Sequence, residues 1–381
     1  MKPRNIAITC GVAGVAVGLA AATGIVYHKQ IMSAASLKRL TGYADGYDLY
    51  AIDIAYDYDL DRIIAAGVRD DQAYIDAVVA QVLPGVPAHV QAPQFACSAF
   101  VAVDAKGRVR TGRNYDFKDD TSALLVRNHP RGGYASIGLA ALNNLGDNTP
   151  LDSVAGRAAA LMGPFAQLDG VNECGVSIAV LTLDSKPCDQ DTQRPVINTS
   201  LAIRLVLDRA ATTQEAVDLL SAYDMHAMAG RDYHFFINDA AGDAHVVEWD
   251  PRDPDRDFKA TPVRQVTNFY ACYGDEVLPN QKNGDLGHGK ERAVAIADVL
   301  DAHVGAQDET IVWEALRAAA QEPNPEDITS NTQWSSLTIP NPPPPLRCAA
   351  TGATSTPSHC KEPDPSALRS PDVVYISIRL S

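Results

Sequence analysis

From residue 97 onward, the alternation of apolar and polar positions predicts short strands that return on themselves. Residues 98–103 and 108–113 are two such runs, and the polar tetrapeptide 104–107 between them ends in glycine, which is typical of a β-hairpin turn. The same kind of pattern predicts strands or hairpin arms at residues 176–183, 233–237, 245–249, 334–339 and 373–378.

Four segments carry apolar residues at helical spacing instead. They are residues 200–211, 213–220, 293–300 and 309–320, and we expect Thr213 to cap the second of them. Strands do not alternate singly with helices, which argues against a doubly wound parallel sheet. The pattern therefore predicts an α+β fold in which helices cover antiparallel sheets.

The N-terminal residues 1–29 have the pattern of an export segment. Lys2 and Arg4 precede an apolar run of 22 residues, 6–27, and about 20 residues are needed for a helix to cross a bilayer. Ala20-Ala21-Ala22 is a candidate cleavage site, so the segment is either a signal peptide or a membrane anchor. We expect an exported protein, membrane-anchored or secreted (periplasmic), that touches the membrane only through this segment.

Residues 30–96 form a second segment with its own composition. Aspartates and tyrosines are interleaved over residues 43–61, and apolar residues recur at helical spacing over residues 70–83 before a Pro-Gly-Val-Pro sequence. The acidic residues match no calcium-binding loop. We interpret the segment as a helical leader, or propeptide, whose tyrosines pack on the main domain, residues 97–381.

Composition and charge exclude some classes of protein. The chain of 381 residues is 46% hydrophobic and 21% charged, which is typical of a globular protein and excludes a largely disordered one. Its formal net charge of −15 gives no general attraction to nucleic acid phosphates. We therefore expect a small-molecule partner and no nucleic acid, and a homo-oligomer is left open.

The seven cysteines and the histidines do not form a metal-binding pattern. No two cysteines fall in a Cys-x-x-Cys pair and the histidines share no ligand spacing, so we expect no metal and no cofactor. In an exported protein, Cys348 and Cys360, within a proline-rich insertion at residues 340–371, are a candidate disulfide pair. Cys188 and Cys272 are a second candidate pair.

Cys97 stands at the junction between the leader and the first predicted strand of the main domain. If the chain is cut before it, its α-amino group lies beside its own thiol. That amine has a reference pKa of about 7.7–8.0, so it can serve as the general base that a thiol nucleophile requires. Taken alone, Cys97 could equally be a buried structural cysteine or half of a disulfide.

The returning strand of the same hairpin favours a catalytic role for Cys97 over a structural one. Arg113 and Asp116 follow Cys97 by 16 and 19 residues with the turn between them, so a strand out and back brings them beside it. An arginine there favours the thiolate, and an aspartate can hold a protonated amine. Without Cys97, the two would be interpreted as an ordinary surface ion pair.

Several short motifs together resemble the choloylglycine hydrolase family of linear amide C–N hydrolases, which includes bile salt hydrolases and penicillin V acylases and, more distantly, acid ceramidase. The first motifs are Phe95-Ala96-Cys97-Ser98 and Gly112-Arg113-Asn114-Tyr115-Asp116. The similarity continues in order through residues 133–136, 169–175, a helix with Arg204 and Leu207-Asp208, and residues 233–234, 247–248, 266–270 and 332–335. It thus covers roughly residues 95–337.

The resemblance implies an N-terminal-nucleophile hydrolase fold, an αββα sandwich of two antiparallel sheets between helical layers. It implies that Cys97 is the nucleophile, with its freed amine as the base, and that Arg113 and Asp116 organise that pair. It also implies self-cleavage, because relatives of the acid ceramidase kind free their cysteine in this way and keep the leader as a subunit.

Three further residues correspond to functional positions of the family. Asn172, in an Asn-Glu-x-Gly turn, and Asn268, in Val-Thr-Asn, correspond to asparagines that form the oxyanion hole, and Arg292 corresponds to a downstream arginine. Amide donors aimed at a tetrahedral oxyanion can each contribute about 3 kcal/mol. Either asparagine by itself would be interpreted as an ordinary turn residue.

The expected activity is hydrolysis of a linear N-acyl amide through a thioester on Cys97. An acyltransferase would share that acyl-enzyme, and an inactive exported binding protein could share the fold, although it would be expected to have lost one of the catalytic residues. The substrate is left open. Leu139, Leu142 and Phe165 lie in segments that could line an acyl pocket or simply form the core.

We predict that the mature protein contains a fragment that begins at Cys97. Intact-mass measurement and N-terminal sequencing of the purified protein check this. A protein that is active yet contains only the uncut chain would contradict the prediction, because Cys97 would then have no free amine.

Overall fold

The computed structural model describes residues 27–41, 47–84, 96–117, 120–146, 151, 153–282, 284–322, 331–339 and 376–378. The apolar run at residues 6–27, apart from Tyr27, lies outside this part of the chain, and so do Cys348 and Cys360. Among the described residues, no helix is both long enough and apolar enough to span a membrane.

The larger of two main sheets has nine strands, in the order β1-β2-β5-β6-β7-β8-β11-β12-β13. Neighbouring strands pair antiparallel, except that β2 runs parallel to β5. The strands are β1 (Lys38–Thr41), β2 (Leu49–Ile54), β5 (Ala123–Asn128), β6 (Ser136–Ala141), β7 (Gln167–Asn172), β8 (Ser177–Leu183), β11 (Asp232–Asn238), β12 (Ala244–Trp249) and β13 (Phe258–Pro262).

The second sheet has five strands in the order β14-β3-β4-β15-β16, all antiparallel. They are β14 (Gln265–Val266), β3 (Ala96–Val103), β4 (Val109–Asp116), β15 (Thr332–Thr338) and β16 (Ile376–Ile378). The predicted hairpin of β3 and β4 is confirmed. Asp104 forms its turn by accepting hydrogen bonds from the backbone N–H groups of Lys106 and Arg108.

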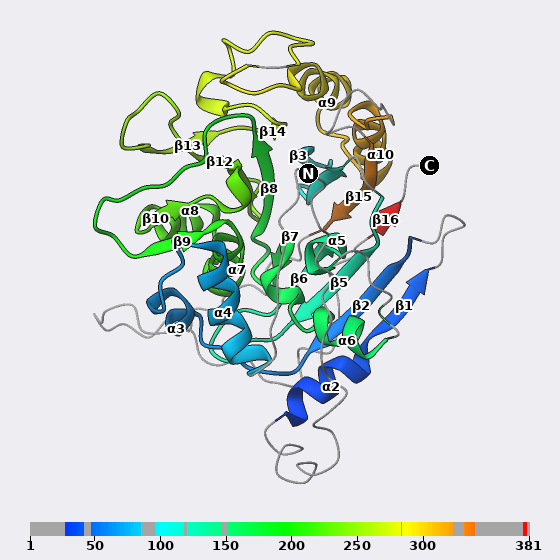
Figure 1. The fold of residues 1–381 in the computed structure, drawn as a ribbon. Helices are drawn as coiled ribbons and strands as arrows, with labels where there is room; N and C mark the ends of the chain where they lie inside the picture. Colours follow the sequence, from blue (N-terminus) through cyan, green and yellow to red (C-terminus); the bar gives the residue numbers. More distant parts are fainter. Residues whose placement is uncertain are drawn as a thin grey trace, which may run out of the picture.

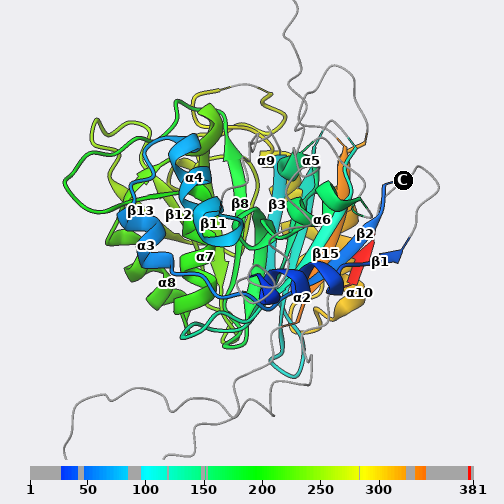
Figure 2. The same cartoon turned by 60° about the horizontal axis from the view of Figure 1, so that its bottom comes forward.

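Helices cover the outer faces of both sheets, as Figures 1 and 2 show. Helices α7 (Thr199–Arg209) and α8 (Thr213–Ser221) pack on the nine-stranded sheet, and α9 (Lys290–Ala302) and α10 (Glu309–Ala318) pack on the five-stranded one. The two sheets meet where β3 lies against β8. The expected αββα layering is confirmed, although the parallel β2–β5 pair makes the larger sheet mixed.

Alternate side chains of β3 pack in two different hydrophobic clusters, one on each face of the strand. Cys97, Ala99 and Val101 belong to the apolar core between the sheets, whereas Phe100 and Ala102 pack with the helix layer of α9 and α10. Successive side chains of a strand point to opposite faces, so this alternation follows from the sequence. It directs the Cys97 side chain inward.

The predicted main-domain helices are present, with one correction at a cap. Thr212, not Thr213, caps α8: its backbone is extended and its side chain accepts a hydrogen bond from Glu215 N. Thr213 is already helical, and its hydroxyl donates to Asp243 O. Shorter elements complete this part of the chain: β9 (Val196–Asn198) parallel to β10 (Asp224–His226), α5 (Asn143–Gly146), α6 (Val154–Ala160) and 3-10 turns at Gly163–Phe165, Met228–Gly230 and Ala271–Tyr273.

The leader is not only helical. It contains α3 (Leu60–Ala65), α4 (Asp71–Val82) and all but the first two residues of α2 (His28–Ser36), but also β1 and β2. Ala51, Ile52 and Ile54 of β2 are buried because this strand pairs with β5 inside the larger sheet. Parallel pairing to a strand some 70 residues away cannot be recognised from local spacing, which explains the difference.

The leader tyrosines pack on the main domain, as expected. The Tyr74 hydroxyl donates to Phe165 O at 2.9 Å, and the Tyr58 hydroxyl donates to Asp208 Oδ2 at 2.8 Å. Tyr56 is buried and donates to Leu161 O. Burial raises the pKa of Tyr58 and Tyr74 above its usual range, which keeps both hydroxyls protonated as donors.

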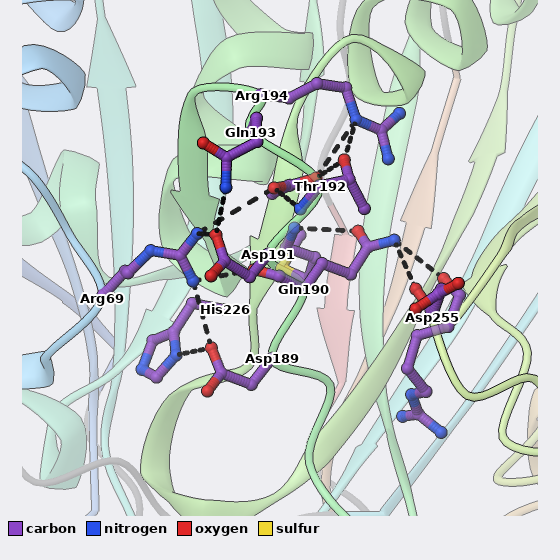
Figure 3. Close-up of polar contacts among 12 residues, drawn as sticks. Arg69, Asp189, Gln190, Asp191, Thr192, Gln193, Arg194, His226 and Asp255 are labelled. Carbon is purple, nitrogen blue, oxygen red and sulfur yellow. Dashed lines mark hydrogen bonds and ion pairs between the residues drawn. The ribbon is translucent and has the colours of Figure 1, made fainter.

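Arg69, between α3 and α4, holds the leader to the loop at residues 189–194 (Figure 3). Its Nη1 donates to Gln190 O at 2.7 Å and its Nη2 to Asp191 Oδ1 at 3.0 Å. These groups are partly exposed, so the ion pair adds little by itself. The strand pairing of β2 is the stronger attachment.

Cys188 and Cys272 do not form the expected disulfide, since both are free. Cys188 is buried and its backbone N–H donates to Asp232 Oδ1, whereas Cys272 lies in a 3-10 turn and its N–H donates to Glu248 Oε1. Different carboxylates thus hold the two backbones. Burial raises the pKa of Cys188 to about 12, so that thiol is protonated at neutral pH.

Gly112 on β4 permits close packing against Phe100 on β3. A Cβ atom at Gly112 would lie 2.3 Å from Phe100 Cζ. We expect Gly112→Ala to lower the free energy of unfolding by about 1–3 kcal/mol, as overpacking does, measured by urea denaturation. In a Phe100→Leu background the substitution should cost less, and an equal cost in both backgrounds would contradict this explanation.

Candidate active site

Cys97 lies near the start of β3 and is fully buried between the sheets. It pairs across the hairpin with Tyr115 of β4. Burial raises the pKa of its thiol to about 12, against the lowering influence of the Arg113 guanidinium, and the nearby Asp116 carboxylate raises it further. In the uncut chain the thiol is therefore protonated at neutral pH.

Arg113 joins the thiol to the opposite sheet. Its Nη2 donates to Cys97 Sγ at 3.2 Å, and its Nη1 donates to Val180 O of β8 at 2.9 Å. Its Nε lies 2.9 Å from Asp169 Oδ2 of β7. Burial raises the pKa of Asp169 and Arg113 opposes that rise. The predicted juxtaposition of Arg113 and Cys97 is thus present, with a carboxylate partner that sequence reasoning did not name.

Asp116 and Arg292 form a second buried ion pair beside the cysteine. Arg292 Nη1 lies 3.1 Å from Asp116 Oδ2 and also donates to Cys97 O at 3.1 Å. The hydroxyl of Thr332 donates to Asp116 Oδ1 at 2.7 Å, and Gln321 Nε2 donates to Oδ2 at 2.8 Å. Both carboxylate oxygens therefore have donors, and Arg292 reaches the site from the first turns of α9.

Asn268 contacts the atom that cleavage before Cys97 would turn into the α-amine. Its Oδ1 accepts from Cys97 N at 3.0 Å and from Arg292 Nη2 at 2.7 Å. Its Nδ2 donates to Thr182 O of β8 at 2.8 Å. The side chain is fully buried, and these three contacts hold both of its polar atoms in place.

The structure does not bring Asn172 into this group. Its Nδ2 donates to Ala210 O at 2.7 Å and to Leu207 O at 3.2 Å, at the C-terminal end of α7. Its Oδ1 accepts from the N–H groups of Cys174 and Val176 in the β7–β8 turn. In this arrangement the side-chain amide of Asn172 is bound to backbone acceptors at the end of α7, and its role in an oxyanion hole stays a prediction.

Sequence reasoning missed three residues that support the site. Asp169 contacts Arg113, and Gln321 and Thr332 donate to Asp116, so the three hold the two predicted partners of the cysteine. Asp169 and Thr332 stand in motifs that the family resemblance had already picked out, but no local rule gives them a role. Thr332 is 216 residues from Asp116, so only the pairing of β15 with β4 brings them together.

An apolar cavity of about 60 Å³ lies between leader helix α4 and the core. Phe165 lines it, as do Tyr74 and Val78 of α4, and it extends to Val180, whose carbonyl binds Arg113. Leu139 and Leu142 are buried in the core but do not line this cavity. Only Phe165 of the three candidate pocket residues therefore borders it.

Two histidine–carboxylate pairs lie near the site, one buried (His234 and Glu248) and one partly exposed (His288 and Asp184). Across the described residues, no group of three or more histidine, cysteine, aspartate or glutamate side chains is placed to hold a metal ion. His234 contacts Glu248 and the carbonyl of Thr267, and His288 Nδ1 contacts Asp184 Oδ2 at 2.5 Å.

The site thus consists of a buried thiol whose sulfur is bound by one arginine and whose backbone nitrogen is bound by an asparagine. Residues 97–253 match the sequence profile of the linear amide C-N hydrolases, choloylglycine hydrolase family. This match agrees with the family that the motifs resemble, and Cys97 is the first residue matched. Asn268 and Arg292 lie beyond the match and join the site through the fold.

Solved structures also resemble the chain. A mutant of the conjugated bile acid hydrolase from Clostridium perfringens is 15% identical with a TM-score of 0.48, over 64% of this chain and 86% of its own. A penicillin V acylase from Agrobacterium tumefaciens is 22% identical with a TM-score of 0.45, over 64% of this chain and 80% of its own. The search of curated proteins found no match.

The raised pKa of Cys97 predicts slow alkylation of the uncut chain. With a pKa of about 12, only a very small fraction of chains carries the thiolate at pH 7, and the rate of alkylation should rise as the pH is raised. Mass mapping of the peptide that spans Ala96 and Cys97 after iodoacetamide treatment reports on uncut chains alone.

Arg113→Gln should slow this alkylation further, because the cation that favours the thiolate is lost. Arg108→Gln, in the same hairpin but half-exposed and turned to Asp104, is the matched control and should leave the rate unchanged. Alkylation at pH 7 as fast as that of a free cysteine would contradict the raised pKa.

Proposed function

We propose that the protein is a cysteine-nucleophile amidohydrolase that cleaves a linear N-acyl amide after cutting its own chain between Ala96 and Cys97. One observation carries this proposal: Arg113 binds the sulfur of Cys97 while Asn268 binds its backbone nitrogen, and Cys97 begins a segment that matches a family of linear amide hydrolases. Nucleophile and future base are thereby held in one residue.

Self-cleavage would use the same thiol. Sγ of Cys97 bonds to the carbonyl carbon of Ala96, the Ala96–Cys97 C–N bond breaks, and the thiol proton is transferred to the departing nitrogen. Water then hydrolyses the thioester, which leaves a carboxylate on Ala96 and restores the thiol. Cys97 N, already bound to Asn268 Oδ1, becomes an α-amine in place.

Amide hydrolysis follows with that amine as general base. An α-amine with a pKa of about 7.7–8.0 can take the thiol proton as sulfur attacks the substrate carbonyl, and it can then protonate the leaving amine. The acyl thioester is hydrolysed by water that the same amine activates. Arg113 favours negative charge on sulfur, and the Asp116–Arg292 pair holds the backbone of Cys97.

The leader would remain attached after the cut. Strand β2 pairs with β5 over six residue pairs inside the larger sheet, and Arg69 adds its contacts with the 189–194 loop. Helix α4 also supplies Tyr74, Ile75 and Val78 to the apolar cavity, which suits the acyl group of a substrate. Leader and main domain therefore form one folded unit.

We expect Cys97→Ala to abolish both the cut and the hydrolysis of N-acyl para-nitroanilides, with at least a 10³-fold loss in kcat/KM. Cys174→Ala, which removes another cysteine, at the β7–β8 turn, is the control and should retain activity. Intact mass reports the cut, and released para-nitroaniline reports hydrolysis. Products formed with added amines distinguish an acyltransferase, and full activity in Cys97→Ala would overturn the proposal.

A further inference from the structure

Asn268 lies on a segment that no long strand supports. Strand β14 ends at Val266, and the segment then passes through Thr267 and Asn268 into the 3-10 turn that begins at Ala271. Nevertheless, the Asn268 side chain must meet Cys97 N at hydrogen-bond distance. The backbone of this segment is bound on one side by residues 286–288, since His288 N donates to Asn268 O at 2.8 Å and Tyr270 N donates to Leu286 O at 3.0 Å. The contacts on its other side come from the larger sheet.

We propose that His234 and Glu248 are positioning residues that hold the 267–272 segment, so that Asn268 is presented to the nitrogen of Cys97. The inference rests on the proposed function, since it concerns the placement of a group beside the base of that reaction. Both side chains are fully buried on neighbouring strands, β11 and β12, of the larger sheet. Neither residue contacts Cys97 itself in any hydrogen bond of the described site.

His234 holds the N-terminal side of the segment. Its Nε2 lies 3.0 Å from Thr267 O, the carbonyl immediately before Asn268. A carbonyl oxygen can only accept, so this nitrogen carries the hydrogen and donates it. The other ring nitrogen, Nδ1, faces Glu248 Oε2 at 3.2 Å.

Glu248 holds the C-terminal side. Its Oε2 accepts from Ala271 N at 3.0 Å, and its Oε1 accepts from Cys272 N at 2.7 Å. Carboxylate acceptors of backbone N–H groups form stronger hydrogen bonds than neutral ones. His234 and Glu248 thus form hydrogen bonds with the backbone at residue 267 and at residues 271 and 272, and Asn268 lies between these positions.

The larger sheet places His234 next to the strand that binds the Asn268 side chain. On β8, Thr182 accepts from Asn268 Nδ2, and Leu181 beside it pairs with His234 of β11. One strand therefore binds the asparagine side chain and its neighbour binds the backbone. A shift of about 1 Å in such a group can cost on the order of 10²-fold in rate.

Two histidine variants separate positioning from mere packing. His234→Gln can place its Nε2 near the histidine Nε2 and keep the hydrogen bond to Thr267 O, whereas His234→Asn is too short to reach that carbonyl but can still face Glu248. We expect His234→Asn to lower kcat on N-acyl para-nitroanilides about 10- to 100-fold with KM within about threefold. His234→Gln should retain at least about a third of the wild-type kcat, at a similar melting temperature.

His303→Asn, at the end of α9 and far from this segment in the sequence, controls for loss of a histidine and should leave kcat unchanged. Equal losses of kcat in His234→Asn and His234→Gln at matched melting temperatures would overturn the inference while leaving the proposed function intact. A wild-type protein that neither cuts itself nor hydrolyses any of the amides would overturn the proposed function and the inference with it.

Glu248→Gln provides the test if His234→Asn does not fold. It keeps the side-chain volume but leaves one oxygen in place of two for the N–H groups of Ala271 and Cys272. We expect kcat to fall about tenfold with KM little changed. A folded Glu248→Gln variant with wild-type kcat would contradict the role of the pair.

Discussion

Arg113 is the residue on which both the site and the meeting of the two sheets depend. Its buried guanidinium binds the sulfur of Cys97 on the smaller sheet and Val180 O and Asp169 on the larger one. A buried cation is tolerated only when its hydrogen bonds and its charge are satisfied, so the sheets must approach in one fixed register at this point. The contacts that satisfy the buried guanidinium between the sheets thus also direct one of its N–H groups at the thiol.

Arg292, on helix α9, is a second buried arginine that connects separate elements of the site. It joins Asp116, the carbonyl of Cys97 and Asn268 Oδ1, so that α9 is tied to the same residue as both sheets. Two arginines and two aspartates, Asp116 and Asp169, balance the formal charge of the buried site. Burial raises the pKa of the thiol, and the Arg113 guanidinium opposes that rise.

The leader belongs to the folded core rather than lying on its surface. Strand β2 is paired inside the larger sheet, and α4 forms one wall of the apolar cavity near Val180. Cutting the chain before Cys97 would therefore change one covalent bond without removing the packing that supports the site.

What the sequence by itself determined was the local chemistry: the hairpin that sets Arg113 and Asp116 beside Cys97 is fixed by a short turn and by the two-residue period of its strands. The family motifs added Asn268 and Arg292. The position of Asn172 in its motif did not reveal that its side-chain amide donates to backbone carbonyls at the end of α7. Only the tertiary structure decided that, because the partners of a buried polar group lie tens to hundreds of residues away. For the same reason the strands of the leader could not be recognised: pairing between distant strands leaves no local pattern to detect.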